Sequence, residues 1–395
     1  MAPKGWPNFD LGAAITIVPG FPFESGHFNT AGQGAPLIRI RDLLTNAPSV
    51  GYTGEIPDGY WVNNGDLLIG MDGDFNIVKW NGGKALLNQR LCSVKTSATD
   101  VLDQDFLFHF LTPWLLRIHS EIGATTVKHL STKHLSGIRT PLPPIDEQRC
   151  ISAVLTAVDD AALAAQAAVE QARLARDAVL DGLLAGDQWP RATFGTLVRV
   201  GSGYAFKAND FTDAATDIPV VRMSNLKTGR LDLSEAKRLP SGLLHGLDAF
   251  QLQAGDFVFG MSGSLTNHAW VTASDLPCCQ NQRVGRLLPK NGTHPRFAAY
   301  LYLSDHVQQG ITQLAAGAAQ LNISASQIES IVVPCPPPEA QARIASILTD
   351  LDDAITQDQR HLESLRITKR GLLDDLLTGR VRVPATALSE ASHAP

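Results

Sequence analysis

The sequence predicts an α+β protein with two tandem domains of mixed α and β structure. Two long helices separate these domains and form an antiparallel coiled coil, so that the molecule has pseudo-twofold symmetry. Two observations support this prediction: an ordered set of motifs occurs twice, and each set ends in a long stretch with a helical apolar spacing. A repeat of roughly 190 residues indicates two duplicated domains, because the repeats of a solenoid are much shorter.

The duplication is clearest at two proline clusters, "TPLPPIDEQ" (140–148) and "VPCPPPEAQ" (333–341), which lie 193 positions apart. Three other motifs recur in the same order. These are "LIRIRDL" (37–43) with "VVRMSNL" (220–226), "GDLLIGMDG" (65–73) with "GDFVFGMSG" (255–263), and "NQR" (88–90) with "NQR" (281–283). The glycine-bounded apolar runs are typical of buried strands. Each copy is therefore expected to form one mixed α/β domain.

Length and composition place the chain among soluble globular proteins. Its 395 residues are enough for two domains of ordinary size, and 44% of them are hydrophobic. No apolar run approaches the ~20 residues that would span a membrane. The opening "MAPKGWPNFD" has no apolar region of a signal peptide, and the five cysteines show no C-x-x-C spacing. We therefore expect a cytoplasmic protein with no disulfide framework, zinc site or membrane partner.

The formal net charge of −6 argues against a uniformly basic nucleic-acid binder. Most of the excess acid follows the two proline clusters, whereas the larger domains are nearly neutral. A phosphate-binding surface would therefore have to be a local basic patch.

Helical patterns are predicted over 146–187 and 339–381. Apolar residues alternate at four and three positions, which is the seam of a coiled coil. The predicted seam residues are Ile151, Leu155, Val158, Val169, Val179 and Leu183 in the first helix, and Ile344, Leu348, Leu351, Ile355, Leu362, Leu365, Leu372 and Leu376 in the second. Arg176 interrupts the first stripe, and Asp358 and Lys369 interrupt the second. At 1.5 Å per residue each helix would be roughly 55 to 60 Å long.

A single helix of this kind cannot cover its own apolar stripe. The economical arrangement pairs the two stripes with each other in antiparallel orientation. The alternative is that each helix packs on its own domain.

The motifs resemble those of the specificity subunit of type I restriction-modification systems. The resemblance rests on the two proline-cluster openings, on the helix ends "DGLLAG" (181–186) and "DDLLTG" (374–379), and on the paired strand and "NQR" motifs. It implies two target recognition domains, each reading one half of a bipartite site in double-stranded DNA. Their expected bounds are 1–145 and 188–338, with helical spacers at 146–187 and 339–381 and a flexible tail at 382–395.

The same resemblance implies partners. Two modification subunits are expected to dock on the spacers and to methylate adenine with S-adenosylmethionine. Restriction and translocase subunits, which use ATP and Mg²⁺, would join through the complex, so no cofactor or metal is expected in this chain. The second proline cluster departs from the family pattern, because Ala340 and Ala342 replace Glu147 and Arg149. We therefore expect two docking surfaces of unequal strength.

Residues shared by both copies cannot distinguish two different half-sites. Base reading is therefore expected where the copies differ, and shared residues are expected to be framework or phosphate contacts. Arg90 and Arg283, which end the shared tripeptide, are interpreted as either turn-stabilising or phosphate-binding residues. The divergent stretches contain polar candidates for DNA contact: Asp74, Asn76, Lys79, Lys84, Lys128 and His129 in the first copy, and Ser264, Asn267, His268, Gln320 and Asn322 in the second. The alternative is that these are ordinary polar loops.

The sequence offers little for catalysis. Asp217, Glu235 and Lys237 have the outline of a metal-dependent nuclease site, but the first copy has no counterpart. Neither an Asn/Asp-Pro-Pro-aromatic motif for adenine methylation nor a G-x-x-x-x-G-K-[ST] motif for ATP occurs. We expect a non-catalytic subunit. The alternatives are a stand-alone nuclease and a helical adaptor without DNA specificity, and a salt-dependent DNA-binding assay would separate them.

Overall fold

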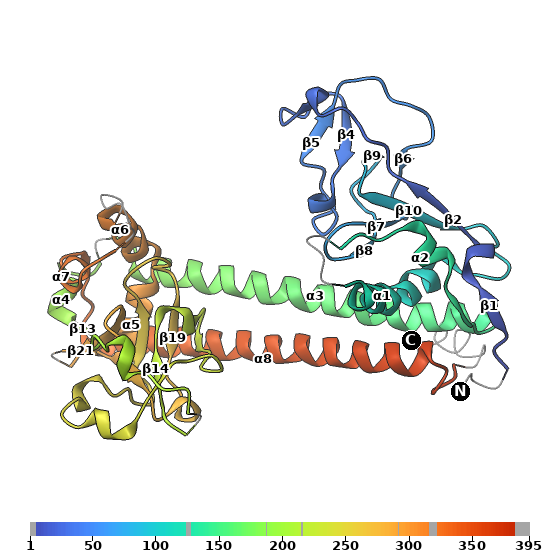
Figure 1. The fold of residues 1–395 in the computed structure, drawn as a ribbon. Helices are drawn as coiled ribbons and strands as arrows, with labels where there is room; N and C mark the ends of the chain where they lie inside the picture. Colours follow the sequence, from blue (N-terminus) through green and yellow to red (C-terminus); the bar gives the residue numbers. More distant parts are fainter. Residues whose placement is uncertain are drawn as a thin grey trace, which may run out of the picture. The chain divides into compact units, whose positions relative to one another are not determined.

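The chain forms two compact units in the computed structural model, which describes residues 5–123, 128–186, 188–214, 216–290, 292–315 and 322–383. Unit 1 comprises Met1–Ala165 and His361–Pro395, and unit 2 comprises Gln166–Arg360. Each unit therefore contains one mixed α/β domain and a part of each long helix (Figure 1).

In the described part of unit 1, three sheets and the helices α1 and α2 form the domain beside the long helices. The four-stranded antiparallel sheet has the order β2 (Ile15–Pro19), β10 (Leu91–Thr96), β7 (Leu67–Gly70), β8 (Ile77–Lys79). The five-stranded sheet has the order β3 (Phe28–Asn29), β5 (Val50–Tyr52), β4 (Ala35–Ile38), β9 (Ala85–Leu87), β6 (Trp61–Val62). A third sheet pairs β1 (Asn8–Asp10) with β11 (Arg139–Pro141), and the helices are α1 (Gln104–Glu121) and α2 (Thr132–Ser136).

Unit 2 repeats this plan. Its four-stranded antiparallel sheet has the order β13 (Val198–Ser202), β21 (Val284–Pro289), β18 (Phe257–Gly260), β19 (His268–Trp270). The smaller sheets are β17 (Arg238–Leu239), β14 (Ile218–Val221), β20 (Cys279–Gln280); β15 (Leu226–Lys227) with β16 (Arg230–Leu231); and β12 (Arg191–Thr193) with β22 (Val332–Pro334). The helices are α4 (Phe194–Leu197), α5 (Pro295–Leu303), α6 (Asp305–Ala315) and α7 (Ala325–Glu329).

The glycine-bounded apolar motifs form the central strands β7 and β18. All four residues of each strand are buried. In β7, Leu67 and Ile69 pack in the cluster that contains α1, whereas Leu68 packs in the cluster around Trp80. Since successive side chains of a strand point to opposite faces, a strand covered on both faces is continuously apolar. In β18, Phe257 and Phe259 likewise pack in one core cluster and Val258 packs in another.

The two long helices are α3 (Ile145–Leu184) and α8 (Pro338–Leu377), of 40 residues each. They begin one residue before the expected bounds and end three and four residues before them. Pro338 is the first residue of α8, where its missing N–H has no helical partner to lose. Gly186 and Gly379 follow the two helices with φ of 78° and 68°, the left-handed conformation that ends many helices.

The seam pairs opposite ends of the two helices within each unit (Figure 1). In unit 1, Ile151 and Leu155 of α3 share a core with Leu376 of α8. In unit 2, Leu180 of α3 shares a core with Ile344 and Leu348 of α8. The pairing is antiparallel, as predicted. The same side chains also pack on the domain of their own unit. The helices therefore pair with each other and also pack on a domain, as both alternatives from the sequence proposed.

All but one of the predicted seam residues are buried or half-buried. Ile151, Leu155, Val169, Ile344, Leu348, Ile355, Leu362 and Leu376 are buried, and Val158, Leu183, Leu351, Leu365 and Leu372 are half-buried. Val179 is 37% exposed, and its neighbour Leu180 is buried instead. The next buried seam position after Arg176 is therefore four residues later, at Leu180, whereas the sequence predicted a spacing of three.

The two cations that interrupt the apolar stripes form ion pairs across the helix pair. In unit 1, Lys369 of α8 lies 2.5 Å from the carboxylate of Asp159 on α3. In unit 2, Arg176 of α3 lies 3.6 Å from the carboxylate of Asp352 on α8. Both members of one pair lie 193 positions from their counterparts in the other, so the contact is reciprocal. The duplication is therefore visible at the level of a single interhelical contact in each unit.

A glutamine explains why both proline clusters end alike. Gln148 accepts a hydrogen bond from the Asp103 N–H at 2.9 Å and donates to the carbonyls of Pro143 at 2.9 Å and Val101 at 2.8 Å. Gln341 accepts from the His294 N–H at 3.0 Å and donates to the Pro336 carbonyl at 2.9 Å. Each glutamine thus joins the start of a long helix to the N-terminus of α1 or α5.

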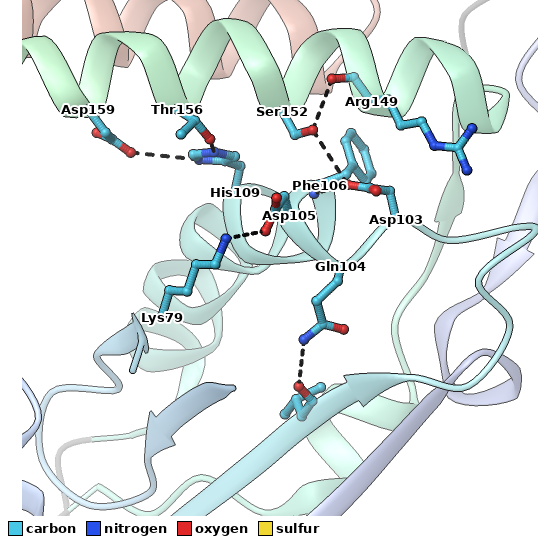
Figure 2. A network of polar contacts seen from close by, with 11 residues as sticks. Lys79, Asp103, Gln104, Asp105, Phe106, His109, Arg149, Ser152, Thr156 and Asp159 are labelled. Atoms are coloured by element: carbon cyan, nitrogen blue, oxygen red, sulfur yellow. Dashed lines mark hydrogen bonds and ion pairs between the residues drawn. The ribbon is translucent and has the colours of Figure 1, made fainter. Parts of the chain in front are cut away.

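A polar network extends this junction in unit 1 (Figure 2). The buried ring of His109 on α1 lies 3.1 Å from Thr156 Oγ1 and 3.9 Å from the Asp159 carboxylate. Burial lowers the pKa of His109 to about 4, and the nearby Asp159 opposes that shift. In unit 2 the equivalent residue is Tyr300, which donates to Asp352 at 2.8 Å. Burial raises the pKa of Tyr300 to about 12.

Two expectations from the sequence need correction. α3 is long and apolar enough to cross a membrane by length and composition, with a mean hydropathy of 1.3 over 18 residues, of which 22% is buried. Many of the apolar residues in this helix are alanines, so the sequence analysis did not count it as a long apolar run.

The second correction concerns the C-terminal tail, which was expected to start at residue 382. Arg382 binds the Glu147 carboxylate at 2.6 and 2.7 Å, and Val383 packs on the core of unit 1. The rest of that tail, 384–395, lies outside the described residues.

Candidate nucleic-acid interface

Three chain segments converge where the central strand of each unit ends. In unit 1, Met71 donates its N–H to the Arg90 carbonyl at 2.8 Å, and Leu130 donates to the Met71 carbonyl at 2.7 Å. In unit 2, Met261 donates to the Arg283 carbonyl at 3.0 Å, and Ile323 donates to the Met261 carbonyl at 3.0 Å. The same backbone frame is therefore built twice.

The frame brings one divergent pair of positions together in each unit. Asp72 and His129 form an isolated antiparallel bridge in unit 1, and Ser262 and Asn322 form the same bridge in unit 2. The backbone geometry is shared while the side chains differ in charge and hydrogen-bonding capacity. These are the properties expected of positions that distinguish one base sequence from another.

In unit 1 the Asp72 carboxylate is the centre of a charged cluster. Its Oδ1 lies 2.7 Å from His129 Nδ1, and its Oδ2 lies 3.3 Å from Arg90 Nε. Arg90 has a φ of 72°, an uncommon conformation for a side chain with a Cβ. His129 and Arg90 are largely exposed, so the cluster faces solvent.

A second arginine of unit 1 is also neutralised by a carboxylate. Arg39 Nε lies 3.7 Å from the buried carboxylate of Asp42, and an Arg39 terminal nitrogen donates to Ser49 Oγ at 2.5 Å. Ser49 in turn donates to Asp42 at 2.5 Å. Arg39 and Asp42 belong to the "LIRIRDL" motif (37–43), and Ser49 follows it in the sequence.

Unit 2 has a cavity of about 900 Å³ at the equivalent end of β18. Arg222 and Arg283 line it, together with amide, hydroxyl and aromatic side chains. The remaining lining residues are Phe206, Ala208, Phe211, Met223, Ser224, Ser262, Gly263, Ser264, Asn267, Asn281, Gln282 and Asn322. No carboxylate is among these lining residues, so the formal charge of the lining is positive. Hydrogen-bond donors and acceptors of several kinds therefore converge on one basic surface.

The structure brings some predicted residues together and separates others. In unit 1, Asp74, Asn76, Arg90, Lys128 and His129 lie on the three converging segments or the turn beside them. Lys128 donates to the His119 carbonyl at 2.6 Å, and His119 lies 3.9 Å from the exposed carboxylate of Asp74. In unit 2, Ser264, Asn267, Arg283 and Asn322 all line the cavity. Gln320 lies outside the described residues.

Three predicted residues lie apart from these sites. Lys79 forms an ion pair of 2.7 Å with Asp105 on α1 (Figure 2). Lys84 lies 4.5 Å from the centre of the Trp61 ring. His268 stacks on Phe257 in a separate hollow beside Arg176 and Asp305. Burial lowers the pKa of His268.

Sequence reasoning missed Asp72, Arg222 and Ser262. A signal was present, because Asp72 and Ser262 are a polar difference inside the shared motifs "GDLLIGMDG" and "GDFVFGMSG". Both residues also open the divergent stretches 72–84 and 262–274, but neither was named as a candidate. Arg222 was overlooked because Arg39 occupies the equivalent position in the first copy, and shared residues were treated as framework.

Two of the three suspected nuclease residues make other contacts. Lys237 pairs with Asp213 at 3.2 Å, and the Asp217 carbonyl accepts a hydrogen bond from Arg238. Among the residues that the structure describes, no group of three or more His, Cys, Asp or Glu side chains is arranged to hold a metal ion.

Two copies of one recognition frame, with different polar groups at the same positions, define a binding protein with two recognition domains. Residues 3–171 and 187–364 each match the family model described as the type I restriction modification DNA specificity domain. The chain belongs to this family and carries the domain twice. Its role is DNA sequence specificity.

Relatives and solved structures agree with this assignment. The chain is 25% identical over 418 aligned positions to the type I restriction enzyme EcoBI specificity subunit of Escherichia coli, covering 98% of this chain and 88% of that protein. It is 23% identical to the MjaVIII specificity subunit of Methanocaldococcus jannaschii, covering 82% and 80%. The crystal structure of a type I restriction-modification S subunit from M. genitalium has a TM-score of 0.58 at 17% identity, covering 95% of this chain and 99% of that one. The fold is thus shared across this sequence distance.

Proposed function

We propose that the chain reads a bipartite sequence in double-stranded DNA, with unit 1 reading one half-site and unit 2 the other. The observation that supports this is the repeated bridge at the end of the central strand, where Asp72 with His129 is replaced by Ser262 with Asn322. One frame carrying two different sets of hydrogen-bonding groups suits two different base sequences. The proposed recognition domains are 1–145 and 188–338.

The proposed role in the complex is to provide the address for enzymes that act elsewhere. The spacers 146–187 and 339–381 would dock two modification subunits, which carry S-adenosylmethionine. Restriction and translocase subunits, with ATP and Mg²⁺, would join the same assembly in the cytoplasm. The isolated chain should then neither methylate nor cut DNA, and methyl transfer by the purified chain alone would refute this assignment.

Domain exchange tests the two-reader arrangement. Residues 1–140 are replaced by the corresponding segment of a relative that has a different target, and the methylated sequence is determined in cells that also express the modification subunit. One half-site should change while the other stays the same, because each domain contacts its own groove segment. If both half-sites changed together, the two domains would not read independently.

DNA-binding measurements separate this function from that of a helical adaptor. The complex with its modification subunits should prefer its target over random DNA, with an affinity that falls steeply with salt. An adaptor without DNA specificity would show no preference among sequences.

A further inference from the structure

The two units treat a shared pair of arginines in opposite ways. Arg39 and Arg90 of unit 1 are each paired with a carboxylate, Asp42 and Asp72 respectively. The equivalent arginines of unit 2 are Arg222 and Arg283. The equivalents of the two aspartates are Asn225 and Ser262, so unit 2 has lost both negative charges.

The lost charges leave the framework intact. Asn225 Oδ1 accepts the Arg222 N–H at 3.0 Å, just as Asp42 accepts the Arg39 N–H at 2.9 Å. Ser262 keeps the backbone bridge to Asn322 that Asp72 makes to His129. The substitutions therefore change the electrostatics of the arginines and not the fold around them.

Both arginines of unit 2 line the same 900 Å³ cavity and are exposed. Among the described residues, neither guanidinium has an ion-pair partner. A guanidinium offers a rigid fork of donors, and its commonest base-specific contact is bidentate, to O6 and N7 of guanine in the major groove. The arginines of unit 1 are partly occupied by carboxylates and are less available for such a contact.

We propose that Arg283 and Arg222 are specificity-determining residues of unit 2 and that they bind guanine in its half-site. This inference rests on the proposed function, since it names the bases that one of the two readers recognises. Asn322 and Asn267 line the same cavity and would supply amide groups for the adjoining base pairs. Unit 1 reads its half-site with a different set, centred on Asp72 and His129.

The test uses the intact complex and its own methylated sequence as the probe. Duplexes carry that sequence and each single base-pair replacement within both half-sites, and binding is measured by competition. The domain exchange described above identifies which half-site belongs to unit 2. Arg283→Lys and Arg222→Lys keep the charge but remove the fork. Each should reduce discrimination at one guanine of that half-site by roughly tenfold to a hundredfold.

Two further variants approach the question from the other side. Ser262→Asp and Asn225→Asp restore the residues that unit 1 carries at the same positions, so the frame should accept them. Each should weaken guanine selection by unit 2, because the arginine gains an internal partner. Arg199→Lys, an exposed change on β13 outside the cavity, is the matched control and should leave selectivity unchanged.

The outcomes are distinct. A uniform loss of affinity for all duplexes, with a smaller salt slope, would make the arginines phosphate contacts and overturn the proposal. Unchanged selectivity, or relaxation at a position without guanine, would also overturn it. Unit 1's half-site is the folding control within the same molecule, and selection there should persist in every variant. If the wild-type complex itself showed no sequence preference, the proposed function would fail instead.

Discussion

Unit 1 and unit 2 share a backbone frame but differ in how their charges are satisfied. In unit 1, Asp42 and Asp72 neutralise the frame arginines, and the Glu147 carboxylate holds Arg382. In unit 2 the equivalents of these three acids are Asn225, Ser262 and Ala340. The comparison shows that the two units keep the same backbone frame, while the charge at equivalent positions differs.

The largest expected effect tests what the units have in common. Gln148→Leu leaves three backbone groups without a hydrogen-bond partner, and Gln341→Leu leaves two. The free energy of unfolding should fall by roughly 1 to 3 kcal/mol for each such group that is buried. Hydrogen exchange resolved by unit should show the greater loss in unit 1. Gln188→Leu, at an exposed position, is the control and should change stability by less than about 0.5 kcal/mol. Equal losses in all three variants would show that the glutamines are not the junctions.

Acid should destabilise unit 1 through His109, and to a greater extent than it destabilises unit 2 through His268, whose pKa is also lowered by burial. The pKa of His109 is about 4 in the folded protein and about 6.5 when unfolded, so the unfolded state binds more protons between these values. This contribution is complete above pH 6.5 and is lost as the pH falls to about 4, on the order of 3 kcal/mol in all.

Tyr300, the counterpart in unit 2, does not titrate in this window, because its pKa is raised to about 12. The measurement is the pH dependence of unit-resolved hydrogen exchange in the wild type and in His109→Gln. Identical acid profiles for the two proteins would contradict the assignment.

A smaller effect is expected where the C-terminal segment is attached. Burial alone would raise the pKa of Glu147, but hydrogen bonds from Arg382 and Trp6 outweigh it, so the net pKa is lowered. Glu147→Ala should cost about 1.5 to 3 kcal/mol, the usual worth of a hydrogen bond to a charged group. Exchange at 378–383 should accelerate, whereas the exposed Asp146→Ala should leave it unchanged. Unaltered exchange in Glu147→Ala would mean that apolar packing alone holds the segment.

The smallest effect should be the same in both units. Lys369→Met removes the half-buried ion pair with Asp159, and Arg176→Met removes the one with Asp352, each worth about 0.5 to 1 kcal/mol. Arg176→Met also removes a pair with the adjacent, exposed Asp177, which should add little. Since the pairs are reciprocal, the two losses should be similar and should add in the double variant. Denaturant unfolding of the three variants measures this. A loss several times larger in one unit would show that the two units do not depend equally on this ion pair.

The sequence predicted the duplicated frame, the antiparallel helix pair and most of its seam. These follow from periodicity and repetition, which a linear pattern records directly. Val179 was misplaced because an alanine-rich stripe gives little contrast between neighbouring positions around Arg176. Lys79 and Lys84 were grouped with the site by their place in a divergent stretch, but their partners, Asp105 and Trp61, lie elsewhere in the sequence.

The charge pairing of the arginines could not be predicted from the sequence. Arg90 and Asp72 are 18 positions apart, and only the fold places the two side chains in contact. A shared arginine looks the same in both copies of the sequence. Whether the arginine is free to contact a base depends on the residue that the fold places beside it. For Arg90 that residue is Asp72, whose equivalent in unit 2 is Ser262, and both lie inside a motif that the two copies share.

The reciprocal pairs Asp159–Lys369 and Asp352–Arg176 bear on how the gene can change. Each half of the chain encodes both an aspartate and a cation, so either half presents both sides of the same contact. A crossover within the helix-coding segments joins one half's recognition domain to the other half's helix and still leaves an aspartate opposite a cation. Such a crossover therefore needs no compensating mutation at these four positions.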